Sequence, residues 1–134
     1  MIETQTTVRV RYAETDQMGI VYHGNYFTWL EVGRIRMLEE IGLPYTEIEA
    51  SGYKLPVLEA KLSYKTPARF DDTVTIISRI QEPPAARLRI SYEVKREDTL
   101  LAVGETVHAF LNSNNRPGRP PEQFAHVIAG YFHK

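Results

Sequence analysis

The sequence predicts an α+β domain in which one long helix covers one antiparallel sheet. From about residue 25 to residue 41, apolar residues recur at helical spacing. From residue 53 onward, apolar and polar residues alternate instead, as they do in strands with one buried face. Turn-forming residues divide this alternating part into four strands, so the predicted order is β-α-β-β-β-β. A single helix and a single sheet must bury their apolar faces against each other, which gives two layers.

The first strand is expected near residues 7–12, where apolar and polar residues alternate. A polar turn follows, and it carries Glu14, Asp16 and Gly19. If the chain is still extended at this point, Glu14 points away from Asp16, so Glu14 is interpreted as a supporting or solvated residue.

The helix is expected to begin near Gly24 or Asn25 and to end at about Ile41. Gly33 in its middle costs about 1 kcal/mol relative to Ala, and a close approach of the helix to the sheet would compensate for this. Gly42 is a typical C-cap, and the proline at position 44 prevents simple continuation before a short helical turn over residues 44–51. The apolar stripe of the helix consists of Tyr26, Leu30, Gly33, Met37 and Ile41.

Four further strands are expected, each with one apolar face. Glu105 falls in phase with Val103 and Val107 on the last strand, so its carboxylate needs a bulge, an open end of the sheet or a bonded partner. Residues 112–123 are rich in turn formers, and helical spacing over residues 124–131 indicates a short docked helix. The residues assigned to the four apolar faces are Leu58, Ala60, Leu62 and Tyr64; Val74, Ile76, Ser78 and Ile80; Leu88, Ile90, Tyr92 and Val94; and Leu101, Val103, Val107, Ala109 and Leu111.

Length and composition predict one domain over residues 1–134, and they limit which binding partners and cellular locations are expected. Hydrophobic residues make up 43% and charged residues 25%, as in ordinary globular domains, and a net charge of −1 offers no basic footprint for nucleic acid. No apolar run is long enough to span a membrane, and no secretory signal is evident at the N-terminus. The absence of cysteine excludes disulfides, thiolate catalysis and Cys-ligated zinc, and it fits a cytoplasmic location.

The residues between Arg11 and Glu31 carry the most informative chemistry. Asp16 lies in the turn, His23 just precedes the helix, and the helix start at Gly24 and Asn25 exposes unpaired amide groups. Such amides, at the positive end of the helix dipole, can polarise a carbonyl or hold an oxyanion. A carboxylate, an imidazole and amide donors at one place point to acyl transfer.

On spacing alone, simpler explanations compete with this one. A turn aspartate usually caps a nearby amide, and a lone histidine is usually an ordinary polar or packing residue. Tyr12 is explained about equally well as an aromatic side chain that packs on the helix.

The run Tyr12-x3-Asp16-x2-Gly19-x2-Tyr22-His23-x-Asn25-Tyr26 resembles the 4-hydroxybenzoyl-CoA thioesterase family. The resemblance extends over roughly residues 5 to 112, and it is closest to the branch of bacterial acyl-CoA thioesterases associated with the Tol–Pal envelope system. It implies a hotdog fold, in which a five-stranded antiparallel sheet wraps around one long helix. It also implies hydrolysis of an acyl-CoA to the free acid and CoA.

The resemblance assigns the catalytic roles residue by residue. Asp16 falls on the family's catalytic acid, which acts either as a nucleophile on the thioester carbonyl or as a general base for water. The backbone amide at the position of His23 serves as an oxyanion donor, and in this branch the His23 side chain is also catalytic. Gly24 and Asn25 belong to the same substrate-binding helix start. Tyr12 occupies the position from which a hydroxyl could hold Asp16 or the substrate.

Coenzyme A carries phosphates, so basic residues are expected at the mouth of the site. Arg87 is the first choice, because it follows the Pro83-Pro84 turn, which the resemblance places near the nucleotide, and the alternatives are Lys65, Arg69 and Arg89. The resemblance further implies a homodimer or homotetramer with the active site between subunits. It implies no metal or redox cofactor.

Other functions fit the sequence less well. The four histidines lack the spacing of a metal site, and no Gly-x-Ser-x-Gly run indicates a serine hydrolase. Two alternatives within the same fold remain. One is an acyl-thioester dehydratase, and the other is a non-catalytic module that binds an acyl-CoA or a protein.

Overall fold

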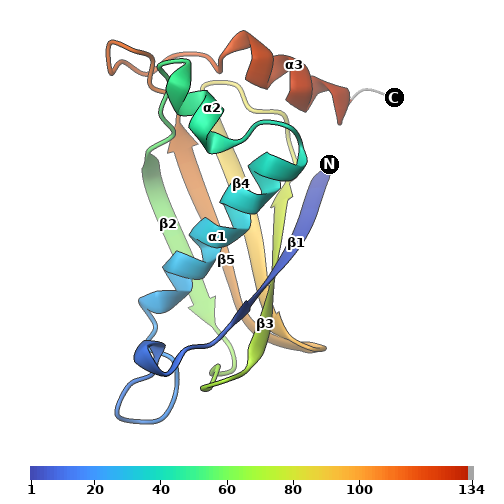
Figure 1. The fold of residues 1–134 in the computed structure, drawn as a ribbon. Helices are drawn as coiled ribbons and strands as arrows, with labels where there is room; N and C mark the ends of the chain where they lie inside the picture. Colours follow the sequence, from blue (N-terminus) through green and yellow to red (C-terminus); the bar gives the residue numbers. More distant parts are fainter. Residues whose placement is uncertain (133–134) are drawn as a thin grey trace.

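A five-stranded antiparallel sheet curves around helix α1 in the computed structural model, which describes residues 1–132 (Figure 1). The strands are β1 (Ile2–Arg9), β2 (Val57–Tyr64), β3 (Thr73–Ile80), β4 (Arg87–Arg96) and β5 (Thr99–Ala109). The helices are α1 (Asn25–Glu40), α2 (Tyr45–Ala50) and α3 (Glu122–Gly130), and a 3₁₀ turn spans Tyr12–Glu14. The predicted α+β class and order of elements are confirmed.

The order of strands across the sheet is β1-β3-β4-β5-β2, so β1 and β2 are the two edges. Helix α1 crosses the concave face and packs mainly on β1 and β3 (Figure 1). The other edge strand, β2, is therefore left largely uncovered, and each of its eight residues is exposed or half-buried. Helices α2 and α3 lie together at one end of the sheet, and the loop between β1 and α1 lies at the other end (Figure 1).

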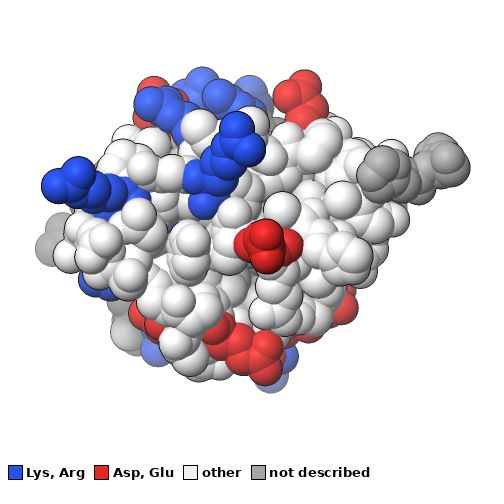
Figure 2. Space-filling view, turned by 90° about the horizontal axis from the view of Figure 1, so that it is seen from above, with Lys and Arg blue, Asp and Glu red and all other residues white. Residues whose placement is uncertain are grey.

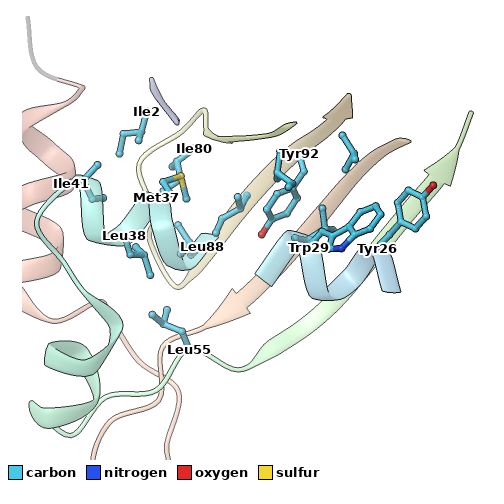
Figure 3. Packing of buried hydrophobic residues seen from close by; sticks show 14 of the residues in the cluster. Ile2, Tyr26, Trp29, Met37, Leu38, Ile41, Leu55, Ile80, Leu88 and Tyr92 are labelled. Carbon is cyan, nitrogen blue, oxygen red and sulfur yellow. The ribbon is translucent and has the colours of Figure 1, made fainter. Parts of the chain in front are cut away.

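The predicted apolar stripe of α1 is the centre of the core. Tyr26 and Trp29 fill the N-terminal end, and Met37, Leu38 and Ile41 fill the C-terminal end (Figure 3). On the sheet, the predicted faces of β3 and β4 are buried, from Val74 to Ile80 and from Leu88 to Val94. Helix α3 docks separately, because Phe124 and Ile128 are buried and the Phe124 ring meets Phe110 at 5.1 Å.

Gly33 is the point of closest approach between α1 and the sheet. A Cβ atom at this position would lie 2.7 Å from both Ile76 Cγ2 and Ser78 Oγ on β3. Such distances are shorter than any ordinary van der Waals contact, so only glycine fits here. The predicted compensation for a mid-helix glycine is confirmed.

The face of β5 that looks toward the helix differs from the prediction. The register pairs Leu88 with His108, Ile90 with Thr106 and Tyr92 with Gly104, and paired residues point to the same side of a sheet. The apolar set that begins with Val103 therefore lies on the outer face, and the helix-facing row is small or polar. Residue-type alternation alone predicted the wrong side because both faces of β5 are substantially buried.

Thr106 and His108 are both 2% exposed, and one chain of hydrogen bonds satisfies them. His108 Nδ1 lies 3.1 Å from the Leu55 carbonyl oxygen and therefore donates to it. His108 Nε2 then accepts from the Thr106 hydroxyl at 2.9 Å, and that oxygen accepts from the Tyr92 hydroxyl at 2.7 Å. Burial, assisted by the nearby Arg34 charge, lowers the pKa of His108 below 6.5, although the bond to Leu55 opposes this.

Glu105 lies on the outer face, where it has bonded partners. Its carboxylate binds Arg89 at 2.6 Å and lies 3.8 Å from Lys61 Nζ on the edge strand. Of the three explanations offered by the sequence, the bonded partner is confirmed.

Charges on the end that carries α2 and α3 are mixed. Lys and Arg side chains gather mainly along one margin of this view and Asp and Glu mainly along the opposite one, with uncharged surface between them (Figure 2). Within residues 1–132, no helix is long and apolar enough to cross a membrane.

Replacing Gly33 by Ala should lower the free energy of unfolding by about 1–3 kcal/mol, because the added methyl group overpacks the helix–sheet contact. This cost should exceed the gain of about 1 kcal/mol in helix propensity. Denaturant titration measures the change. Gly130→Ala is the matched control, because a Cβ there meets nothing within 4 Å, and its effect should be neutral or slightly stabilising.

Stability should fall as the pH drops below about 6.5, because His108 takes up a proton in the unfolded chain but resists it in the folded one. The stabilisation that the neutral His108 contributes is fully present above that pH. Below it, the free energy of unfolding falls by up to about 1.4 kcal/mol per pH unit. Denaturant titrations between pH 5 and pH 7 measure the free energy of unfolding at each pH. This free energy should change less steeply with pH in His108→Asn than in the wild type. The exposed His126→Asn should keep the wild-type slope, and equal slopes for both variants would contradict this explanation.

Candidate active site

The loop between β1 and α1 folds back on itself as a tight hairpin. Thr15 pairs with Val21, the Asp16 amide donates to the Ile20 carbonyl at 2.8 Å, and the Gly19 amide donates to the Asp16 carbonyl at 3.1 Å. Gly19 adopts a φ of 79°, which glycine tolerates without strain. This hairpin holds Asp16 half-buried at its base.

The Asp16 carboxylate is held by one oxygen only. Its Oδ1 accepts a hydrogen bond from the Met18 amide at 2.8 Å, which is the Asx turn that the spacing alone suggested. Within residues 1–132 the carboxylate has no other hydrogen bond, so Oδ2 is free to act on a bound molecule. The turn role and a chemical role are therefore compatible.

Helix α1 begins after Gly24, which is the N-cap and contributes no side-chain cap. The Asn25 amide donates to the Tyr22 carbonyl at 3.0 Å, and the Tyr26 amide donates to the His23 carbonyl at 3.3 Å. In the part of the chain that the structure describes, the amides of His23 and Gly24 donate to no oxygen. These two amides are the available oxyanion donors.

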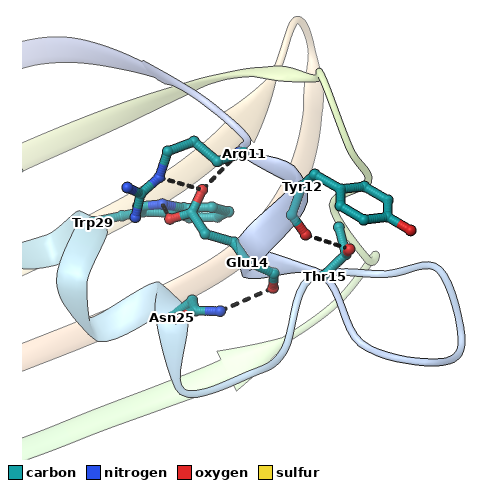
Figure 4. A network of polar contacts seen from close by, with 6 residues as sticks. All are labelled: Arg11, Tyr12, Glu14, Thr15, Asn25 and Trp29. Carbon is teal, nitrogen blue, oxygen red and sulfur yellow. Dashed lines mark hydrogen bonds and ion pairs between the residues drawn. The ribbon is translucent and has the colours of Figure 1, made fainter.

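Asn25 has a structural task at the helix start. Its side-chain Nδ2 donates to the Glu14 carbonyl at 2.8 Å and so ties the helix start to the hairpin (Figure 4). Its backbone amide is also bonded. The structure thus favours Gly24 over Asn25 as a direct contact to substrate.

A pocket of about 260 Å³ opens beside His23. The Tyr64 hydroxyl, from the end of β2, donates to the His23 carbonyl at 2.9 Å and fixes this corner of the backbone. The His23 ring lies between Tyr22 and Tyr64, with ring centroids at 4.4 Å and 6.1 Å. The alternating pattern predicts Tyr64 only as a strand residue, not as part of the site. An aromatic residue at the end of a strand, just before a turn, was the available signal. The pocket lining includes Ile20, Val21, His23, Tyr26, Tyr64 and Lys65.

Glu14 is buried, so of the two interpretations offered by the sequence the structure excludes the solvated one and agrees with the supporting one. It is 6% exposed, and its carboxylate accepts from the Arg11 amide at 2.8 Å and from Trp29 Nε1 at 3.1 Å (Figure 4). Arg11 Nε adds an ion pair at 3.7 Å. The chain leaves its extended form at Tyr12, so the alternation that pointed Glu14 outward no longer applies. Glu14 locks the hairpin to helix α1.

Tyr12 is not part of a strand, and this expectation was wrong. Strand β1 ends at Arg9, and Tyr12 begins the 3₁₀ turn with 76% of its surface exposed. Its ring meets Phe70 edge-on at 5.5 Å, and its carbonyl accepts from the Thr15 hydroxyl at 2.7 Å. A role for its hydroxyl in catalysis stays a prediction.

The candidate phosphate-binding residues lie at different ends of the sheet. Lys65 lines the pocket beside His23, and Arg69 pairs with Ile20 of the hairpin. Arg87 is the first residue of β4, whereas the hairpin adjoins the far end of that strand, about 30 Å away at the rise of an extended chain. Within one chain, Lys65 and Arg69 are therefore brought to the site and Arg87 is not.

No cluster of three or more His, Asp or Glu side chains in residues 1–132 is arranged to bind a metal ion. His133, one of the four histidines considered, lies outside the described residues.

The comparison with family models decides the family. Residues 10–128 match the thioesterase-like superfamily, and this span includes the hairpin, helices α1 and α2, strands β2 to β5 and most of α3. The chain belongs to this superfamily. The predicted hotdog fold is confirmed with it.

Individual relatives agree. YneP of Bacillus subtilis, named for acyl-CoA thioesterase activity, is 44% identical over 99 residues, which are 74% of this chain and 72% of YneP. The crystal structure of a hypothetical protein from Thermus thermophilus matches with a TM-score of 0.90 and 41% identity, over 94% of this chain and 97% of that one. A DHNA-CoA thioesterase from Staphylococcus aureus matches with a TM-score of 0.90 and 29% identity, over 98% and 91% of the two chains.

Replacing Glu14 by Gln should lower the free energy of unfolding by about 1–3 kcal/mol. The glutamine side chain has one acceptor oxygen in place of two charged ones, so its NH₂ group must face either the Arg11 amide or Trp29 Nε1, which are themselves donors. Thermal and denaturant unfolding measure this loss. Glu40→Gln, at the exposed end of α1, is the control and should change little. If Glu14→Gln unfolds with the same free energy as the wild type, the charged contacts of Glu14 are not needed to hold the hairpin on α1.

Proposed function

We propose that this chain hydrolyses the thioester bond of an acyl-CoA to the free acid and CoA. The family and the activities for which its relatives are named support the reaction class. The observation that carries the proposal is the hairpin itself. It places a carboxylate with one free oxygen and two unbonded amides in a single loop at the start of a helix.

The proposed roles follow from these groups. The thioester carbonyl is held by the amides of His23 and Gly24, and the dipole of α1 stabilises the negative charge that develops on its oxygen. Asp16 acts either as the nucleophile that attacks the carbonyl carbon or as the base that activates water. The His23 imidazole assists by orienting water or donating to the oxygen. Lys65, and Arg69 next to it, attract the phosphates of CoA. No step requires a metal or a redox cofactor.

We further propose that two or four copies of the chain assemble, with β2 at the interface. This edge strand exposes Val57, Leu58 and Tyr64 by 44–47%, and an uncovered apolar edge favours pairing with another strand. Tyr64 also lines the pocket beside His23, so the interface and the active site would adjoin. Arg87 can contribute to the site only if it comes from a second copy.

The finer assignments also stay proposals. The run from Tyr12 to Tyr26 supports the 4-hydroxybenzoyl-CoA thioesterase family and its Tol–Pal-associated branch, and the lack of cysteine supports a cytoplasmic location.

Replacing Asp16 by Asn should leave the fold intact and lower the hydrolysis rate by at least ~100-fold, the scale for losing a nucleophile or general base. An assay of CoA release over a panel of acyl-CoAs measures it. Asp98→Asn, in the exposed turn between β4 and β5, is the matched control and should keep wild-type turnover. Turnover within a few-fold of wild type for Asp16→Asn would refute the proposed role.

A further inference from the structure

A second pocket, of about 300 Å³, lies between α1, α2 and the strands β4 and β5. Most of its walls are apolar, and Leu38, Leu55 and Leu88 come from three different parts of the chain (Figure 3). Its polar side chains are Glu31, Arg34, Tyr45 and His108. A pocket of this size with a few polar groups is typical of a site for a small organic group.

The floor of this pocket is uncharged and already satisfied. The hydrogen-bond chain from Tyr92 through Thr106 and His108 to the Leu55 carbonyl uses every donor along it. Because His108 donates from Nδ1 and accepts at Nε2, it is neutral. The floor therefore offers neither a positive charge nor a free donor to a ligand.

Arg34 is the exception, because its guanidinium bonds the neutral Tyr92 hydroxyl but has no carboxylate within 4.0 Å other than Glu31 among residues 1–132. Its side chain is 18% exposed, and within residues 1–132 its one ion pair is with Glu31 at 4.0 Å. The Glu31 side chain is 65% exposed and so well solvated. A largely buried guanidinium has five donors and is stabilised best by a planar oxyanion. The Tyr45 hydroxyl, whose oxygen faces the Leu55 amide at 3.5 Å, keeps its proton for a second hydrogen bond.

One face of α1 connects this pocket with the catalytic hairpin. Phe27, Glu31 and Arg34 follow one another at i, i+4 and i+7, so they share a side of the helix. On β2, Leu62 is half-buried and Tyr64 is 45% exposed, and the Tyr64 ring packs on Tyr26 of α1. From Asn25 to Arg34 the helix rises by about 14 Å. An extended chain advances ~1.2 Å per bond, so about a dozen bonds span this distance.

We propose that the second pocket receives the far end of the acyl chain, and that Arg34 selects a chain that ends in a carboxylate. The inference rests on the proposed acyl-CoA hydrolysis, because the thioester end is placed at the hairpin. The last methylene groups contact Leu38, Leu55 and Leu88, and the terminal carboxylate binds the Arg34 guanidinium and the Tyr45 hydroxyl. A methyl-terminated chain of the same length makes neither of these charge-assisted hydrogen bonds and therefore binds less tightly.

Calorimetric binding of non-hydrolysable alkyl-CoA thioethers tests the proposal independently of turnover. The pair to compare is a dodecyl thioether and its analogue with a carboxylate at the chain end. The wild type should bind the carboxylate form about 10- to 100-fold more tightly, the range for a charge-assisted hydrogen bond in a desolvated site. A hexyl pair, which is too short to reach Arg34, should show no such preference.

Variants of the pocket make the test specific. Arg34→Gln should remove the preference while the affinity for the methyl-terminated form stays within about 3-fold, and Arg34→Lys should retain part of it. Tyr45→Phe should reduce the preference by a few-fold, and it provides a second test if Arg34→Gln fails to fold. Arg36→Gln is the matched control, because this exposed arginine lies two residues along the same helix and lines neither pocket.

Equal affinities of the wild type for both dodecyl thioethers would overturn the inference, as would a preference that survives Arg34→Gln. A loss of affinity for both forms in Arg34→Gln would also overturn it, because that pattern indicates a structural role. The proposed hydrolysis is judged separately. If the wild type discriminates the two thioethers but releases no CoA from any thioester, hydrolysis fails while the pocket assignment stands.

Discussion

The position of α1 depends on a single missing side chain. At Gly33 the helix backbone approaches β3 so closely that a methyl group would overlap Ile76 and Ser78. Because the helix is pressed onto this half of the sheet, it packs mainly on β1 and β3, and β2 stays the more exposed edge. The pocket beside His23 opens next to Tyr64 at the end of β2, and the second pocket lies between α1, α2, β4 and β5. The position of α1 therefore shapes both pockets.

The hairpin that carries Asp16 is positioned by a second constraint, which acts through Glu14. A carboxylate that is 6% exposed must have its charge satisfied, and it finds the Arg11 amide on one side and Trp29 of the helix on the other. Trp29 is itself part of the core, so its hydrogen bond to Glu14 ties the hairpin to a well-packed part of the helix. Asp16, two residues later, can then be held by one oxygen while the other remains free. Residues that place a reactive group work well when their own positions are locked by packing.

Much of this could be read from the sequence, and the exceptions have physical reasons. The stripe of α1, the buried faces of β3 and β4 and the glycine contact follow from periodicity. Tyr12 was wrongly expected in a strand, because β1 ends at Arg9 and a 3₁₀ turn begins at Tyr12. Arg87 is separated from the hairpin by the length of a strand, and only the sheet order reveals this. For β5, both faces are buried, so residue type could not indicate which one meets the helix.

The helix-facing row of β5, which contains Thr106 and His108, is polar, although the sequence predicted an apolar row. Burying Thr106 and His108 is tolerable only because each donor along the row finds an acceptor. An apolar row would cover the same surface without this requirement. In the polar row, losing any one hydrogen-bond partner leaves a buried polar group unpaired, which costs stability. Because His108 is neutral in this row, the charged side chains that line the pocket are Arg34 and Glu31, and Glu31 is the more exposed of the two. At the other end of the helix, the free groups are backbone amides and a carboxylate. The two ends of α1 therefore present different chemistry: the proposed hydrolysis uses the amides and the carboxylate, and the proposed chain-end site uses the guanidinium.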